Sequence, residues 1–200
     1  EALAAGGFDA AHVLTPPDTH AAIAMPLLEA GCDVLLEKPM AASREQCARL
    51  AEAAAASGAA LGINQNFLFH PAFLALRRAV ANGRRGRLRF VDCVYSVPLR
   101  QLSAGQLGHW MFAEPANILL EQAVHPLSQI AALLGGIEAV EAVPDAPQAL
   151  YEGRCFHAGW TISLRGPSLS ATLRFAVGET FPFWQLTAIC DDGAIVADIL

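Results

Sequence analysis

The first third of the chain alternates between short apolar runs and longer segments in which apolar residues recur at helical spacing. Three apolar runs are expected to be buried strands: residues 11–15, 33–36 and 60–63. Two helical segments lie between them: residues 20–30 and 43–57. Pro26 is expected to bend or shorten the first helix, and Ser43-Arg44-Glu45-Gln46 has the form of a capping box that opens the second. This order predicts a parallel sheet with right-handed crossovers and helices on both faces.

The pattern changes after residue 66. A helix is expected over residues 71–81, a long and partly alternating strand over 88–96, a loop over 100–115 and a helix over 116–134. Five further strands follow without intervening helices: residues 137–143, 152–164, 168–177, 184–190 and 194–199. The predicted fold class is therefore α/β. Residues 1–66 form part of a doubly wound, Rossmann-type unit, and residues 67–200 form an α+β domain with a large, open, mostly antiparallel sheet.

Composition excludes several classes of function. The net charge of −6 gives no reason to expect nucleic acid or an anionic membrane as a partner. No run of residues is typical of a membrane span. The five scattered cysteines indicate reduced thiols in a cytoplasmic protein, and the histidines have no spacing typical of a metal site.

The first candidate site follows the second strand, where Glu37-Lys38-Pro39 ends an apolar run. Ligands of parallel α/β sheets bind beyond the carboxyl ends of the strands, which is where Lys38 is expected. Thr15-Pro16-Pro17 ends the preceding strand in the same way. The structural alternative is a solvated ion pair between Glu37 and Lys38.

The second candidate site is in the predicted helix over residues 116–134. Glu121 and His125 are four residues apart and are expected to share one helix face. Pro126 cannot donate a hydrogen bond to the carbonyl of Gln122, so we expect the helix to be distorted beside His125. The structural alternative is a histidine held by a local ion pair on an otherwise apolar helix.

Together these motifs resemble the Gfo/Idh/MocA oxidoreductases. They are Thr15-Pro16 with His20, Gly31-x-x-Val34-Leu35-Leu36-Glu37-Lys38-Pro39, Asn64-x-Asn66-Phe67 with Pro71, Gly86, and Leu120-Glu121-x-x-x-His125. The resemblance implies a Rossmann domain for NAD or NADP and a second domain that binds substrate and forms homo-oligomers through its open sheet. It also implies reversible hydride transfer between the nicotinamide and a C–OH group of a sugar, a polyol or a related compound.

The resemblance also implies roles for single residues. Lys38, His125 and Glu121 would be catalytic. The residues expected around the cofactor are Thr15, Pro16, His20, Glu37, Lys38 and Asn66. The residues expected around the substrate are Asn66, Trp110, Glu121 and His125. Trp110 fits a sugar ring through its aromatic face, and it fits the anchored tip of a loop equally well.

The residue types suit this chemistry. Oxidation of an alcohol needs a base for the hydroxyl proton, and a neutral histidine oriented by a carboxylate can serve. A lysine ammonium can polarise the alkoxide or carbonyl oxygen. Either Lys38 or His125 fits the role of base, and the sequence does not decide between them.

The chain also departs from the pattern of the family. Its residues include no Gly-x-Gly-x-x-Gly turn, so we expect a piece of a longer protein, truncated also at its C-terminus. We expect the 200-residue chain alone to bind dinucleotide weakly or not at all, and micromolar affinity in a nicotinamide titration would overturn this. Glu121 replaces the usual aspartate, Ala123 a glycine, Ser128 a second aspartate and Pro17 an asparagine.

Two other functions remain open. Some relatives of the fold cleave glycosidic bonds by transient oxidation, which would release a leaving group without net NADH. The second alternative is a non-catalytic module that dimerises or binds a partner through the open sheet. The presence of Lys38, Glu121 and His125 argues against it.

Overall fold

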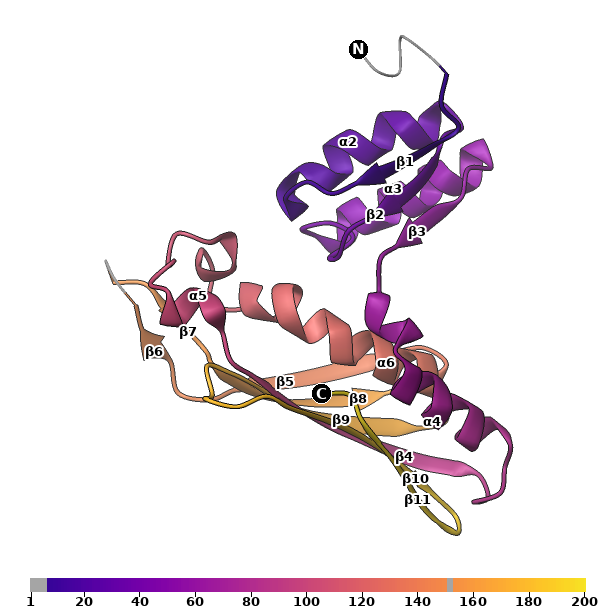
Figure 1. The fold of residues 1–200 in the computed structure, drawn as a ribbon. Coiled ribbons are helices and arrows are strands. Elements are labelled where there is room, and N and C mark those ends of the chain that lie inside the picture. The colour runs from indigo at the N-terminus through magenta and orange to yellow at the C-terminus, as the bar shows by residue number, and fades with distance from the viewer. Residues whose placement is uncertain (1–6, 151–152) are drawn as a thin grey trace. The chain divides into compact units, whose positions relative to one another are not determined.

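The computed structural model describes residues 7–150 and 153–200 and divides into two units (Figure 1). The described residues of the first unit form three parallel strands and two helices. The units are Glu1–Gln65 and Asn66–Leu200, and each has its own apolar core. The elements of the first unit are β1 (Ala10–Val13), α2 (Pro17–Glu29), β2 (Asp33–Leu36), α3 (Arg44–Ser57) and β3 (Leu61–Ile63). The strands lie in the order β1-β2-β3, so the parallel sheet is confirmed.

The expectation of helices on both faces of this sheet is wrong for the described residues. Val13, Val34 and Leu36 are buried in one core with residues of α2 and α3. Leu35, on the opposite face, is 41% exposed and lines a hollow of about 490 Å³. Two right-handed crossovers that step in the same direction across a sheet place both helices on one side, which the alternation of elements alone does not reveal.

Local signals fix the ends of the helices. The Ser43 hydroxyl accepts a hydrogen bond from the backbone N–H of Gln46 (3.2 Å), which confirms the capping box, and Gly58 ends α3 in the left-handed conformation. Helix α2 begins at Pro17, because a proline in the first turn needs no hydrogen-bonded N–H. Pro26 does not shorten α2, which continues to Glu29.

The second unit consists of helices packed on one face of a six-stranded sheet. Its helical elements are η1 (Asn66–Phe69), α4 (Pro71–Ala81), α5 (Arg100–Ser103), η2 (Trp110–Phe112), the π-helical turn η3 (Leu119–Ala123) and α6 (Val124–Leu134). Its strands are β4 (Leu88–Val97), β5 (Ala139–Pro144), β6 (Gln148–Ala149), β7 (Cys155–Phe156), β8 (Gly159–Arg165), β9 (Ser170–Val177), β10 (Phe183–Cys190) and β11 (Gly193–Asp198).

The six-stranded sheet has the order β11-β10-β4-β9-β8-β5. All its neighbouring pairs are antiparallel except β4 with β9, so the predicted mostly antiparallel sheet is confirmed. Alternate residues of β4, β9 and β10 are buried, and helices α4 and α6 cover this face (Figure 1). Among the described residues, no helix of this unit covers the other face of the sheet (Figure 1).

One predicted strand differs from the structure. Residues 152–164 contain two strands, β7 and β8, separated by His157 and Ala158, and residue Glu152 lies outside the described residues. Strand β7 pairs with β6, a two-residue strand that the sequence pattern did not predict. Two-residue strands are too short to produce a periodic pattern.

Gly86 lies where the turn after α4 meets the turn between β10 and β11. Its φ of +74° lies in the left-handed region, and a Cβ built on it would be 2.7 Å from the Cβ of Asp191. The Asp191 carboxylate accepts a hydrogen bond from the backbone N–H of Arg87 (2.9 Å). This bond, together with the Arg87 and Arg89 guanidinium groups, holds the pKa of Asp191 below its usual value. The turn therefore requires glycine for two separate reasons.

Gly86→Ala is expected to lower the free energy of unfolding by about 2–4 kcal/mol, since it adds backbone strain and a steric clash. The measurement is urea unfolding. Gly83→Ala is the matched control, because Gly83 has a φ of +68° and a Cβ added to it would meet no atom within 4 Å. Equal losses in the two variants would show that the contact with Asp191 contributes nothing.

Within the described residues, none of the helices combines the length and the apolar character needed to cross a membrane.

Candidate active site

Polar residues gather at the carboxyl ends of the three parallel strands in the first unit. Glu37 directly follows β2 and Asn64 directly follows β3. The Asn64 side-chain amide donates a hydrogen bond to Glu37 Oε1 (2.7 Å), and His12 Nε2 lies 3.9 Å from the same oxygen. Glu37 therefore joins the ends of two strands. Its expected contact with a cofactor stays a prediction.

His20 is fully buried beneath the loops that carry Thr15 and Lys38. Its Nδ1 lies 2.9 Å from the carbonyl oxygen of Pro39, and its Nε2 lies 2.7 Å from that of Thr15. A singly protonated imidazole donates to one of these carbonyls, and a doubly protonated one donates to both. Either way His20 ties the loop after β1 to the loop after β2. Its expected role beside the cofactor stays a prediction.

Lys38 lies between the half-buried Glu37 and the buried Pro39, with a cis peptide bond to the proline. The residues on both sides of it are thus held by hydrogen bonds, Glu37 through Asn64 and Pro39 through His20. At the neighbouring strand end, the exposed Thr19 hydroxyl donates to Thr15 Oγ1 (2.7 Å) and can alternatively donate to Pro16 O (2.7 Å). The sequence-predicted residues of this unit therefore share one edge of the sheet.

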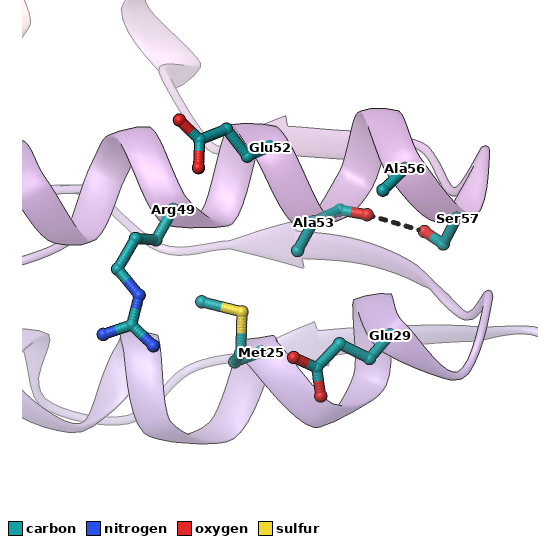
Figure 2. Close-up of a pocket in the computed structure, with 7 residues that line it drawn as sticks. All are labelled: Met25, Glu29, Arg49, Glu52, Ala53, Ala56 and Ser57. Atoms are coloured by element: carbon teal, nitrogen blue, oxygen red, sulfur yellow. Dashed lines mark hydrogen bonds between the residues drawn. The ribbon is translucent and has the colours of Figure 1, made fainter.

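A groove of about 470 Å³ on the helical face of this unit contains none of the predicted site residues (Figure 2). Met25 and Glu29 of α2 and Arg49 and Ala53 of α3 line it. In Figure 2, the Ser57 hydroxyl donates within its own helix to the Ala53 carbonyl (2.9 Å). The groove is lined by the outer surfaces of two neighbouring helices, and it is distinct from the edge that carries Lys38.

In the second unit, His125 lies in the first turn of α6, directly after the π-helical turn that contains Glu121. The expected distortion beside His125 is thus confirmed, and it takes the form of a π turn. Pro126 lies three residues after the π turn and has no N–H to donate to that turn. Single π turns inside helices occur frequently at functional sites.

Aromatic side chains fix the surroundings of His125. The Phe67 ring meets the His125 ring edge-on, with 4.9 Å between centroids and an angle of 67°. Phe67 also contacts Trp184, whose ring centroid is 4.5 Å away, and Trp184 contacts Tyr95 at 4.9 Å. Trp184 and Tyr95 are almost completely buried. His125 therefore packs against an aromatic cluster that extends to the sheet.

A buried tyrosine lies next to the segment that carries Glu121. The Tyr95 hydroxyl donates a hydrogen bond to Gln122 Oε1 (2.9 Å). Burial first, and the negative charge of Glu121 second, raise the pKa of Tyr95 well above its usual value. The Tyr95 hydroxyl is therefore protonated near neutral pH. Its hydrogen bond to Gln122 links β4 to the π turn.

The two remaining predicted residues lie on short 3₁₀ turns. Asn66 is the exposed first residue of η1. Trp110 begins η2, where its carbonyl accepts a hydrogen bond from the Asn117 side chain (3.1 Å) and the following residues Met111 and Phe112 are buried. The loop that carries Trp110 is thus anchored to the core, and a contact between Trp110 and substrate stays a prediction.

Tyr95, Gln122 and Gln129 have roles that the sequence motifs did not predict. Tyr95 is on the buried face of an alternating strand, and a buried phenol requires a hydrogen-bond acceptor, so this signal was present in the sequence. Gln129 is a polar residue four positions after His125 on an apolar helix. Among the described residues, no group of three or more His, Cys, Asp or Glu side chains is arranged to hold a metal ion.

Two family models match the chain. Residues 1–65 match the model described as "Oxidoreductase family, NAD-binding Rossmann fold", and residues 73–193 match the GFO/IDH/MocA C-terminal domain. The resemblance stated from the motifs is thereby confirmed.

The chain is similar to proteins that act on sugars and polyols. It is 33% identical over 127 residues to dTDP-3,4-didehydro-2,6-dideoxy-alpha-D-glucose 3-reductase of Streptomyces violaceoruber, which covers 64% of this chain and 36% of that protein. It is 36% identical over 91 residues to inositol 2-dehydrogenase 1 of Saccharopolyspora erythraea, which covers 44% of this chain and 27% of that protein. The chain thus spans about a third of the length of these curated relatives.

Solved structures share the fold. GenD2 from gentamicin A biosynthesis, in complex with NAD, superposes with a TM-score of 0.77 at 22% identity over 95% of this chain and 54% of that one. An inositol dehydrogenase homologue from Azotobacter vinelandii, complexed with NADH and myo-inositol, has a TM-score of 0.77 at 20% identity over 94% of this chain and 50% of that one.

Proposed function

Because this chain belongs to the GFO/IDH/MocA oxidoreductase family, we propose that the protein carrying it transfers hydride between NAD and a C–OH or C=O group of a sugar, a polyol or a related small molecule. The observation that carries the proposal is the edge of the parallel sheet at which Lys38 follows β2 between two hydrogen-bonded neighbours. This is the position at which parallel α/β sheets bind their ligands.

The residues present fit a nicotinamide dinucleotide. Thr15 and Lys38 are at adjacent strand ends, and buried His20 links the loops that carry them. When bound, the cofactor supplies the carbon that accepts or donates hydride. NAD is the preferred cofactor of the proposal, since the solved relatives named above bind NAD or NADH.

We assign the remaining steps to side chains of the chain. In the oxidation direction, the substrate hydroxyl loses its proton to a base as its carbon loses hydride, and the C–O bond becomes a carbonyl. Lys38 as ammonium stabilises the negative charge that develops on that oxygen. His125 accepts the proton or orients the hydroxyl, and Glu121 is the carboxylate expected to act with it. Asn66 and Trp110 are proposed to contact the substrate.

The test is turnover by the full-length protein, measured with NAD⁺ and myo-inositol and, in the other direction, with NADH and 1,5-anhydro-D-fructose. The second substrate is suggested by the 1,5-anhydro-D-fructose reductase of Ensifer adhaerens, to which the chain is 32% identical over 123 residues. Absorbance at the NADH band gives the rate. Net formation or consumption of NADH supports the proposal. Release of a leaving group from a glycoside without net NADH would instead indicate the oxidation-assisted glycosidase. If the folded protein binds NAD but shows neither activity, both proposals are contradicted.

We further propose that the open sheet mediates formation of a homo-oligomer. Exposed apolar side chains on this face include Phe183 and Ile189 of β10, Val196 of β11 and Val143 of β5. Light scattering of the full-length protein is expected to give a multiple of the protomer mass, and Ile189→Arg is expected to lower it, because an interface core excludes unpaired charge. A monomeric wild-type protein would rule this out.

A further inference from the structure

Gln129 is the one fully buried polar side chain among the described residues of the second unit. It lies on α6, four residues after His125 and hence on a similar face of the helix. Its side-chain amide donates a hydrogen bond to the backbone carbonyl of Phe67 (2.9 Å). Its Oε1 atom is also buried and has no hydrogen-bond partner among the described residues.

This arrangement is costly as a packing solution. A buried acceptor without a partner loses its hydration and receives nothing in return, whereas an apolar residue of similar volume carries no such penalty. Leu127, Ile130 and Leu134 of the same helix are apolar and pack in or against the core. The hydrogen bond to Phe67 is therefore the feature that distinguishes glutamine from methionine or leucine at this position.

The hydrogen bond connects two parts of the candidate site. Phe67 follows Asn66 in the η1 turn, and its ring contacts the His125 ring with 4.9 Å between centroids. The carbonyl that Gln129 binds thus belongs to the residue that packs on His125. Fixing this one backbone group fixes both the Phe67 ring and the segment that begins with Asn66 relative to α6.

We propose that Gln129 is a positioning residue that holds the η1 turn, with Asn66 and Phe67, in register with His125. The proposal rests on the proposed oxidoreductase function for its effect on turnover, and on contacts within the second unit for its geometry. Gln129 acts through Phe67 and touches neither substrate nor cofactor in this scheme.

Two variants of the full-length protein test the role. Gln129→Met keeps the length and volume of the side chain and removes the donor. Gln129→Glu keeps the shape and replaces the donor with an acceptor. Ile162→Val on β8 is the packing control, since Ile162 is buried and β8 is separated from β4 by β9.

The first readout does not require activity. The chain has six histidines, so ¹H–¹³C spectra of the histidine rings, assigned with His125→Asn, resolve the His125 protons. The Phe67 ring current acts on these protons. Both Gln129 variants are expected to shift the His125 resonances, and Ile162→Val is expected to leave them in place. Unchanged His125 resonances in Gln129→Met would overturn the proposal.

The second readout is turnover of myo-inositol with NAD⁺. Gln129→Met is expected to lower kcat/KM by about tenfold to a hundredfold, the range for small displacements of reacting groups. The temperature of unfolding should stay close to that of the wild type. If the resonances shift but the wild-type protein turns over none of the probes above, the proposed function is contradicted, whereas the positioning of His125 by Gln129 is supported. If the wild type is active and kcat/KM is unchanged in Gln129→Met, the inference fails while the proposed function stands.

Discussion

Lys38→Ala is expected to lower the kcat of the full-length protein by about a thousandfold, because removal of an ammonium that stabilises a developing alkoxide, or of a base, typically has effects of this size. Lys38 is the only lysine among the 13 Lys and Arg residues of the chain, and its neighbours Glu37 and Pro39 are held by Asn64 and His20. NAD affinity and the temperature of unfolding should change little. The measurement is initial rates at saturating substrate.

Lys38→Arg tests which property of the lysine matters. A guanidinium keeps the positive charge but does not release its proton near neutral pH. If Lys38 is the base, Lys38→Arg should therefore lose turnover as Lys38→Ala does. Arg49→Ala is the matched control, since Arg49 lines the groove between α2 and α3 and lies apart from the strand ends. A kcat for Lys38→Ala equal to that of the wild type would remove Lys38 from the mechanism.

His125→Ala is expected to lower kcat by about 10²- to 10⁴-fold, the usual contribution of a positioned general acid or base. Because Phe67 and α6 fix the ring, its loss also leaves a space that a small base can enter. Added imidazole should therefore restore part of the rate if His125 is the base. His157→Ala is the control, since the His157 side chain contacts the backbone of Asp145 instead (2.7 Å).

The pH dependence of kcat/KM separates the two candidate bases. The base must be unprotonated for oxidation, so kcat/KM in this direction rises with pH until the base has lost its proton. The variant without the base loses this rising limb, whereas the variant without the other residue keeps it at a lower rate. A rising limb that persists unchanged in both variants would mean that neither Lys38 nor His125 is the base.

The sequence predicts those features that depend on neighbouring residues. The capping box at Ser43, the helix ends at Gly58 and Gly135 and the strand that buries Val91, Cys93 and Tyr95 follow from short-range preferences. The motifs around Lys38 and His125 were likewise visible in the sequence. Features that depend on distant residues were not: the one-sided cover of the first sheet, the parallel pairing of β4 with β9, and the pairing of β6 with β7.

The same division applies to the candidate site. Glu37, His20 and Gln129 are recognisable as unusual polar residues in apolar surroundings, but their partners Asn64, Pro39 and Phe67 are 19 to 62 positions away in the chain. Periodicity carries no information on such pairs. The sequence therefore predicted Glu37 and His20 as candidate residues but not Gln129, and the structure shows which side-chain and backbone groups hold all three.

The π turn before α6 has a consequence for the redesign of specificity. A π turn accommodates one more residue than an α-helical turn over the same path. Deleting one residue between Leu119 and Ala123 should therefore regularise the helix, so that the side chains of the turn itself, Glu121 among them, change direction while Ile130 and Leu134 keep their positions in the core. Libraries that vary the length of this turn would thus alter the direction of the acidic side chain independently of His125, a change that substitutions at fixed length cannot make.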